Sequence, residues 1–171
     1  IKPGITSISE RAFVYLPELK EVDIQKGVTK IGKEAFAYCD KLSRINIPDT
    51  VKSIGTDAVW CGYYWSDSSH AYFCKIHAPY GSYAVTYAKK NNISYACNIS
   101  GAAVTGIKKT YTYTGSDIKP VPTVTLGKAK LSVINDYHVT YQNNKKAGTA
   151  TLKIIGDNHF YGTITLNFQI T

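Results

Sequence analysis

A repeat with a period of 23 residues near the N-terminus constrains this chain more than any other feature of its sequence. The segment GITSI at residues 4–8 recurs as GVTKI at 27–31 and, loosely, as TVKSI at 50–54. Six apolar columns superpose in this frame: Ile8, Ile31 and Ile54; Ala12, Ala35 and Ala58; Phe13, Phe36 and Val59; Leu19 and Leu42; Val22 and Ile45; Ile24 and Ile47. A unit this short cannot bury its own apolar face, so neighbouring units must stack into a solenoid with a continuous core.

Each unit combines two kinds of local pattern. Alternating apolar pairs, such as Ile5 with Ile8 and Val22 with Ile24, favour short strands with their side chains on one face. Between the pairs lies a compact segment centred on Ala-Phe, as in EAFAYC at residues 34–39. We expect this segment to form a helical or turn-like leg that joins the two strands of a coil.

The repeats also carry a family resemblance. The sequence IGKEAFAYCDKLSRINIP at residues 31–48 resembles the consensus of the BspA-like leucine-rich repeats of bacterial surface proteins, and the match covers about residues 4–60. The resemblance implies a right-handed solenoid with one strand per repeat on its concave side. It also implies a secreted or wall-attached protein with an adhesive role.

The segment GSYAVTYAKKNNI at residues 81–93 is expected to close the array. Ser82 can cap a helix whose apolar residues Tyr83, Val85, Tyr87 and Ala88 need burial. Residues 91–92 can end the helix, and residues 93–97 are predicted to form a closing strand. Similar endings close the BspA-like repeats, so we assign residues 1–98 to a solenoid with its C-terminal cap. Because the chain contains no Met, we expect a piece of a longer protein with further repeats before it.

The period disappears after residue 98, where small residues indicate a linker at 99–104. Alternating patterns predict strands at residues 110–114, 121–126, 137–141, 149–155 and 163–170. Strands without a helical pattern favour an all-β sandwich or open barrel at 105–171. This part is similar, over about residues 104–171, to the small Ig-like modules of bacterial surface proteins, which implies an Ig-like β-sandwich whose Tyr residues pack in the core and across strands. The expected fold class is α+β or mostly β.

An aromatic segment replaces the expected leg after Trp60. It interrupts aromatic residues with Gly, Ser and Asp and shows neither a strand nor a helix period. Recognition surfaces are enriched in aromatic residues because these give large contact areas at low entropic cost. The predicted ligand-binding residues are Trp60, Tyr63, Tyr64, Trp65 and Tyr72. The alternative, that these rings only cover the end of the solenoid or pack on the β module, remains open.

The four cysteines are better explained by structural roles than by catalysis or metal binding. Cys39 occupies the repeat column of Leu16, so we interpret it as a small buried apolar residue. Cys61 and Cys74 bracket the aromatic segment, and a disulfide between them is a possible bridge in an oxidising compartment. The sequence leaves the redox state of these two residues and of Cys97 open.

Catalytic and metal-binding patterns are absent from the sequence. Cys61, His70, Cys74 and His77 are zinc-ligand types, but they lack a tightly spaced pair, so we expect no metal site. No nucleotide fingerprint, paired catalytic carboxylates or supported nucleophile arrangement occurs, so we expect neither an enzyme nor a cofactor.

Charge and hydropathy exclude two further classes of partner. The net charge of +8 is spread along the chain, which favours a solvated basic surface over nucleic-acid binding. No apolar stretch reaches the length of a membrane span.

The sequence therefore predicts a non-catalytic bacterial cell-surface protein. Its expected role is adhesion or ligand binding through the solenoid, with a protein or glycan of a host or of a neighbouring cell as partner. The alternative is a structural stalk that projects other domains from the cell wall. In both cases we expect an extracellular location, with wall attachment through regions outside this sequence.

Overall fold

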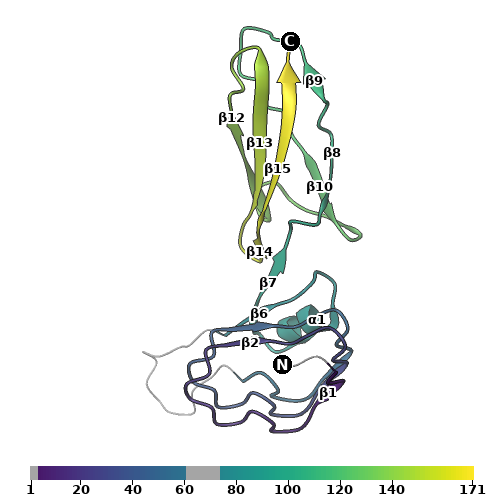
Figure 1. Cartoon of the computed structure of the whole chain (residues 1–171), viewed down its shortest axis with the longest axis vertical. Helices are drawn as coiled ribbons and strands as arrows, with labels where there is room; N and C mark the ends of the chain where they lie inside the picture. The colour runs from purple at the N-terminus through teal and green to yellow at the C-terminus, as the bar shows by residue number, and fades with distance from the viewer. Residues whose placement is uncertain (1–3, 61–73) are drawn as a thin grey trace. The chain divides into compact units, whose positions relative to one another are not determined.

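The computed structural model describes residues 4–60 and 74–171. The chain forms two compact units, Ile1–Cys97 and Asn98–Thr171, which are drawn in Figure 1. The first unit contains parallel sheets, as expected for stacked repeats, and the second contains mainly antiparallel strand pairs. The described part of the chain is thus mostly β.

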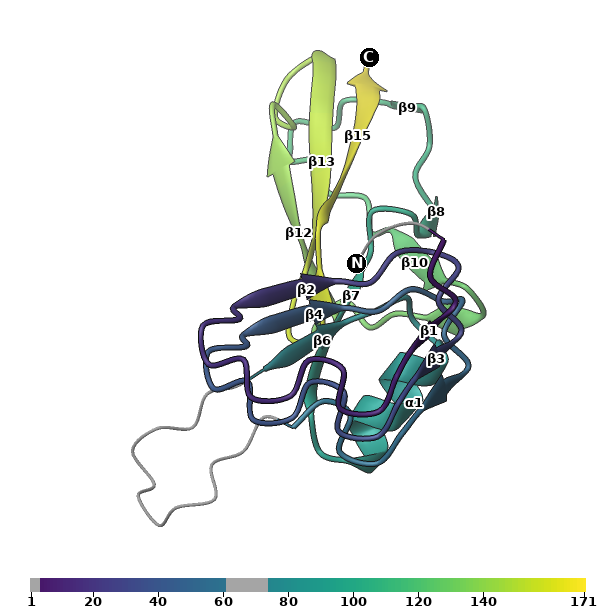
Figure 2. The same ribbon diagram turned by 60° about the horizontal axis from the view of Figure 1, so that its bottom comes forward.

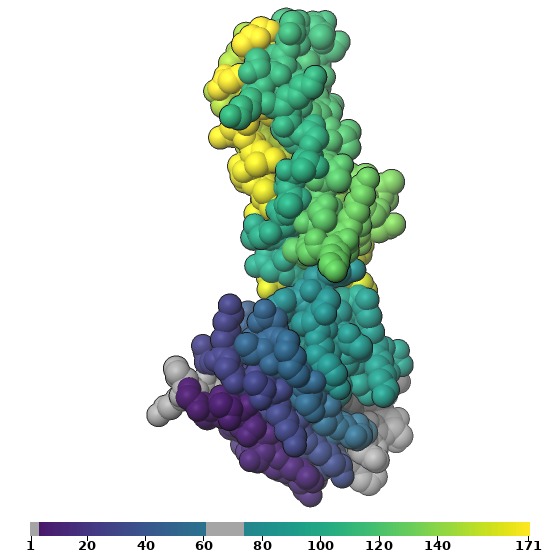
Figure 3. All heavy atoms as spheres, turned by 90° about the vertical axis from the view of Figure 1, so that its right-hand side faces the viewer, coloured from purple at the N-terminus to yellow at the C-terminus, as the bar shows by residue number. Residues whose placement is uncertain are grey.

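Parallel strands run through the coils of the first unit. One sheet has the order β1 (Ser7–Ile8), β3 (Lys30–Ile31) and β5 (Ser53–Ile54). A second sheet pairs β2 (Glu21–Asp23), β4 (Arg44–Asn46), β6 (Lys75–His77) and β7 (Ser94–Asn98) in that order. Figure 2 shows β2, β4 and β6 side by side, and Figure 3 shows successive coils as adjacent bands from purple to teal. The predicted repeat strands are confirmed.

The repeat columns form the core of the first unit. Ile8 pairs with Ile31, and Ile31 pairs with Ile54, so residues 23 positions apart lie in register. Ile31, Ala35, Phe36 and Ile45 are fully buried. In the first coil the corresponding positions are less covered: Ala12 is exposed, and Phe13 and Leu19 are half-buried. The strand columns are therefore already buried in the first coil, at Ile8, Val22 and Ile24, whereas the leg columns become buried only from the second coil onward.

The segment between the strands is turn-like rather than helical. Its backbone hydrogen bonds run between coils: the Phe13 N–H donates to the Ala35 carbonyl at 2.9 Å, and the Phe36 N–H donates to the Ala58 carbonyl at 2.8 Å. Positive φ angles recur with the same 23-residue period, at Arg11, Glu34 and Asp57 and at Tyr15 and Tyr38. Short-range bonds within a leg, such as that from the Ala37 N–H to the Glu34 carbonyl at 3.1 Å, satisfy only some of its backbone groups, and the next coil satisfies others.

The coils approach one another most closely at a glycine column. A Cβ placed on Gly32 would lie 2.4 Å from the backbone nitrogen of Glu10, and one on Gly55 would lie 2.5 Å from that of Lys33. Both distances are far below a normal van der Waals contact. Glycine is required here by space between coils, since neither residue has a positive φ.

The cap contains helix α1 (Tyr83–Lys90). As predicted, Ser82 is its N-cap and accepts a hydrogen bond from the Val85 N–H at 3.4 Å, and Asn91 is its C-cap. The helix buries Ala84, Val85, Tyr87 and Ala88. The expectation that Tyr83 is buried is wrong: this side chain is 44% exposed, because the covered face of the helix passes through Ala84 instead.

The second unit contains two sheets. One has the order β11 (Ala129–Lys130), β10 (Thr123–Leu126), β8 (Ala103–Thr105), all antiparallel. The other has the order β12 (Tyr137–Gln142), β13 (Gly148–Gly156), β15 (Thr163–Ile170), β9 (Thr110–Tyr111), with β9 parallel to β15. A short strand, β14 (Phe160–Tyr161), precedes β15. The five predicted strand regions are confirmed with shifted ends, whereas β8, β11 and β14 were not predicted.

The start of the second unit contributes to its core. Ile99 is fully buried, and its N–H donates to the carbonyl of Tyr161 at 2.9 Å. Ala103–Thr105 forms β8, which pairs with β10. A stretch expected to be a linker thus contains core and strand residues.

The tyrosines of the second unit divide into two groups. Tyr137 is buried, and the Tyr111 ring packs edge-on against Phe168 with ring centroids 5.2 Å apart. In contrast, Tyr113 and Tyr161 are exposed. The expected packing role therefore holds for Tyr111 and Tyr137 but not for Tyr113 and Tyr161.

Candidate functional site

The β2–β4–β6 sheet of the solenoid presents a polar outer face. Each of these strands points its central residue inward, since Val22, Ile45 and Ile76 are all buried. The flanking residues point outward and are aligned by the parallel register. We call this surface the outer strand face; it comprises Glu21, Asp23, Arg44, Asn46, Lys75 and His77.

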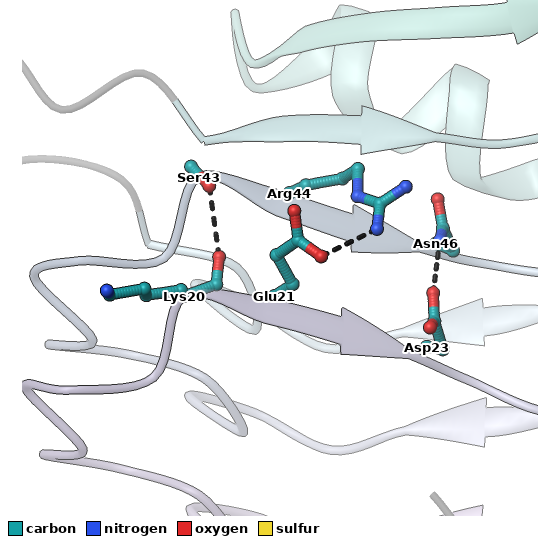
Figure 4. Close-up of polar contacts among 6 residues, drawn as sticks. All are labelled: Lys20, Glu21, Asp23, Ser43, Arg44 and Asn46. Atoms are coloured by element: carbon teal, nitrogen blue, oxygen red, sulfur yellow. Dashed lines mark hydrogen bonds and ion pairs between the residues drawn. The ribbon is translucent and has the colours of Figure 1, made fainter.

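Side chains on this face contact one another between coils, as Figure 4 shows. The Arg44 guanidinium lies 2.7 Å from the Glu21 carboxylate, and the Asn46 amide donates to Asp23. At the strand entrance the Ser43 hydroxyl donates to the Lys20 carbonyl at 3.1 Å. The Glu21 and Arg44 side chains both keep solvent contact, so this ion pair contributes little stability and chiefly fixes the direction of the two groups.

The outer strand face changes its charge from one coil to the next. Strand β2 contributes the acidic residues Glu21 and Asp23, whereas β4 and β6 contribute Arg44 and Lys75. Burial lowers the pKa of His77, and the nearby charges of Arg44 and Lys75 lower it further. His77 is therefore neutral at physiological pH, and the face has an acidic edge next to a basic centre.

A second surface feature is a stack of aromatic rings on the legs. The Tyr15 and Tyr38 rings stack with centroids 4.6 Å apart and 8° between their planes, and Trp60 continues the stack at 6.2 Å from Tyr38. We call these three residues the aromatic ladder. Tyr15 is 60% exposed, while Tyr38 and Trp60 are half-buried. The sequence prediction missed Tyr15 and Tyr38, although their 23-residue separation is a signal that could have found them.

Most of the predicted ligand-binding residues cannot be placed. Trp60 lies at the end of the aromatic ladder. Tyr63, Tyr64, Trp65 and Tyr72 lie outside the described residues. The binding role of this aromatic segment therefore stays a prediction.

The described cysteines are buried. The Cys39 thiol donates to the Phe13 carbonyl at 3.1 Å, and burial raises its pKa, which confirms the small buried residue expected there. Burial also raises the pKa of Cys97 to about 11, so that this thiol stays protonated and unreactive near neutral pH. Cys74 is buried as well, but Cys61 lies outside the described residues, so the Cys61–Cys74 bridge remains a prediction.

Within residues 4–60 and 74–171, no three His, Cys, Asp or Glu side chains come together as a metal site would require. Of the four zinc-ligand types considered above, Cys61 and His70 fall outside these ranges. No helix in the same ranges is long and apolar enough to cross a membrane.

One segment of the chain matches a known protein family. Residues 6–62 match the family described as BspA type leucine rich repeat region (6 copies). Repeats of this type generally belong to surface proteins with binding roles and are typically non-catalytic. No curated protein and no solved structure matches the chain, and the β-rich region that follows is not assigned to a family. Residues 6–62 are therefore BspA-type leucine-rich repeats.

Proposed function

We propose that this chain is a non-catalytic, extracellular adhesion protein that binds a protein partner through the outer strand face. The observation that carries this proposal is the charge change across that face, from Glu21 and Asp23 on β2 to Arg44 and Lys75 on β4 and β6. The parallel register holds these groups in fixed rows. A rigid surface with two signs of charge selects both the partner and its orientation.

The aromatic segment is a second proposed contact. Trp60 supports it, because this ring extends the aromatic ladder from Tyr15 and Tyr38 toward the segment that follows. Tyr and Trp are enriched among the residues that contribute most of the binding energy at interfaces. We assign Trp60, Tyr63, Tyr64, Trp65 and Tyr72 to this contact.

Residues 105–171 are proposed to form an Ig-like β-sandwich that follows the capped solenoid of residues 1–98. The support is the presence of two separate sheets, β11-β10-β8 and β12-β13-β15-β9, with buried Val124 on one and buried Leu152 and Phe168 on the other. This arrangement of two sheets with inward apolar residues is typical of sandwiches.

A structural stalk is the second candidate function. Ion pairs link neighbouring coils at residues 23 positions apart: Glu18 with Lys41 at 2.7 Å, Glu21 with Arg44 at 2.7 Å, and Arg11 with Glu34 at 3.6 Å. Because these charges are already paired between coils, they need no binding partner to neutralise them, which favours a structural role.

Binding of the whole chain to an array of extracellular-matrix proteins and glycans tests the proposal. The test variant is R44A/K75A, and the matched control is K30A/K52A, which removes two positive charges from exposed residues outside the outer strand face. We expect the test variant to weaken binding about tenfold and the control to change it by less than about twofold.

Three results would speak against this assignment. Equal loss of binding in both double variants would show that the effect comes from net charge alone. Loss in W60A alone would place the contact in the aromatic segment. Absence of any partner on the array would favour the stalk.

A further inference from the structure

The aromatic ladder holds two tyrosines of adjacent coils face to face. The Tyr15 and Tyr38 rings are parallel to within 8°, and their centroids lie 4.6 Å apart. Trp60, from the next coil, follows at 6.2 Å from Tyr38 with a larger tilt of 26°. The two phenol rings are therefore in direct contact on the surface of the legs.

The backbone directs both rings the same way. Tyr15 and Tyr38 have nearly equal positive φ angles, 59° and 58°, and the Tyr15 N–H donates to the Ala37 carbonyl at 3.1 Å. A bulky residue at such a φ is uncommon, because its Cβ crowds the backbone. Strained positions of this kind cluster at functional sites, so a tyrosine kept there in both coils points to a role for the pair.

The pair is accessible to an oxidant from solvent. Tyr15 is 60% exposed. Tyr38 is only half-buried, although a ring from the coil on each side stacks on it. Because stacking covers the faces of the Tyr38 ring, its edge is the part left to solvent. The neighbouring Cys39 thiol, which would otherwise compete for an oxidant, is buried.

We propose that Tyr15 and Tyr38 form an oxidative cross-link, a dityrosine that joins the first two coils. The oxidant is a peroxide, used by a haem peroxidase. Each phenol loses one electron and its hydroxyl proton, and the two phenoxyl radicals form a carbon–carbon bond between ring carbons next to the oxygens. The hydrogens of those two carbons move to the oxygens. Two tyrosines and one hydrogen peroxide thus give one dityrosine and two waters.

The stacked pair needs only a local movement to react. The product joins the two rings edge to edge, so one ring must turn about its side-chain bonds. Tyr15 has room to turn because most of its surface is exposed, whereas Tyr38 is held between two rings. Partners held in contact react far faster with each other than with a second molecule. The cross-link lies on the legs and does not depend on the function proposed for the outer strand face.

The experiment oxidises the whole chain and maps the product by mass spectrometry. One reaction uses hydrogen peroxide with a haem peroxidase. A second uses a photoactivated ruthenium complex with persulfate, a small oxidant that reaches rings too recessed for an enzyme. Trypsin releases Tyr15 in residues 12–20 and Tyr38 in residues 34–41, and each peptide contains one tyrosine. We expect the two peptides as one linked species, with a mass equal to their sum less two hydrogens.

An equal mixture of ¹⁴N-labelled and ¹⁵N-labelled chains distinguishes a link within one molecule from a link between two. We expect both peptides of the linked species to carry the same isotope. The treated chain should also unfold at a higher urea concentration than the untreated chain, measured by circular dichroism. The reason is that the link closes a loop over residues 15–38 and restricts the unfolded chain.

Two conservative variants test whether the ladder is the preferred site. Tyr15→Phe keeps a ring in the stack but removes one phenol, whereas Tyr83→Phe removes a phenol that is 44% exposed outside the ladder. We expect the first to lower the total yield of dityrosine fluorescence about tenfold and the second to leave it within about twofold.

Four results would overturn the proposal. Neither oxidant produces the linked species, the linked species mixes isotopes at random, or the two variants lower the yield equally. The fourth is an unchanged urea midpoint in the treated chain, which would show that the link does not join the coils in their native packing.

Discussion

Gly55 lies where the backbones of two coils come closest. A methyl group at this position would lie 2.5 Å from the backbone nitrogen of Lys33, and backbone cannot rotate away as a side chain can. We expect Gly55→Ala to lower the free energy of unfolding by about 1–3 kcal/mol. Both tryptophans of the chain, Trp60 and Trp65, belong to the first unit, so tryptophan fluorescence during urea denaturation reports on this change.

Gly101→Ala, in the second unit, is the control for adding a methyl group at a glycine with free space, and its unfolding is followed by far-ultraviolet circular dichroism because the tryptophans belong to the first unit. An added Cβ at Gly101 meets no atom within 4 Å, and its φ is not positive. The control should stay within about 0.5 kcal/mol of the parent chain. An unchanged midpoint in Gly55→Ala would show that the coils can move apart at little cost.

His77 makes the stability of the solenoid depend on pH. Its pKa is lowered in the folded chain, chiefly by burial, so that between this value and the unfolded pKa near 6.5 the unfolded chain binds more protons. The free energy of unfolding should therefore decrease as the pH falls from about 7.5 to about 5. Urea denaturation at the two pH values measures this decrease.

His77→Asn removes the titrating ring and retains a polar side chain. We expect this variant to lose part of the pH dependence while unfolding similarly to the parent chain at pH 7.5. A pH dependence equal to that of the parent would assign the effect to other groups.

At the scale of elements, strand β12 fastens the extended segment before β10 through two tyrosine hydroxyls. Tyr137 donates to the Pro122 carbonyl at 3.0 Å, and Tyr141 donates to the Pro120 carbonyl at 2.7 Å. Burial raises the pKa of both tyrosines. Tyr137 and Tyr141 lie on the same face of β12, since side chains an even number of positions apart share a face, and the carbonyls they bond are two residues apart.

Removing the Tyr137 hydroxyl should destabilise the second unit. Tyr137→Phe leaves the Pro122 carbonyl without its hydrogen bond, and we expect a loss of about 1–2 kcal/mol in the free energy of unfolding, measured by far-ultraviolet circular dichroism. Tyr113→Phe, which changes an exposed tyrosine, is the control and should have almost no effect. Equal effects of the two substitutions would contradict the fastening role.

The sequence predicted elements whose physical cause is local or periodic. The strands of the repeats follow from the columns of Ile31 and Ile45, and the helix α1 follows from Ser82 as its N-cap. The left-handed residues of the legs, such as Glu34, were not predicted, because hydrogen bonds to the next coil impose them against the preference of the residue itself. The short strands β8 and β11 were not predicted for a similar reason, since pairing with β10 defines them.

The candidate site was less accessible to sequence reasoning than the fold. An aromatic cluster attracts notice by composition, and so Trp60 was found. The polar residues of the outer strand face form no recognisable sequence motif. Glu21, Arg44 and Lys75 are seen to lie side by side only once the register of β2, β4 and β6 is known. The hydrogen bonds between Asn144 and Ile118 likewise join residues that are distant in sequence.

At the scale of the whole molecule, the position of the boundary between the two units has a direct test. A fragment of residues 98–171 retains buried Ile99 and strand β8, whereas a fragment of residues 106–171 loses both. We expect the longer fragment to unfold cooperatively in urea and the shorter one to lack a cooperative transition, because β10 then loses one of its two partner strands and the core loses a fully buried side chain.

A cooperative transition in both fragments would place the boundary after β8. The absence of a transition in both would show that the second unit needs residues of the solenoid to fold. Circular dichroism and amide proton dispersion distinguish these outcomes from the expected one.

The uniform offset of the intercoil contacts has a consequence for how such a protein changes length over evolution. Arg11 meets Glu34, Glu18 meets Lys41, and Glu21 meets Arg44 with the same spacing of 23 residues. Among the first three coils, a duplication or deletion of one whole period therefore creates no new type of interface, whereas the offset of 31 residues between paired residues of β4 and β6 shows that another length is accommodated where the extra residues lie between paired strands. Selection can thus adjust the reach of the solenoid in whole steps while the packing chemistry of each step stays constant.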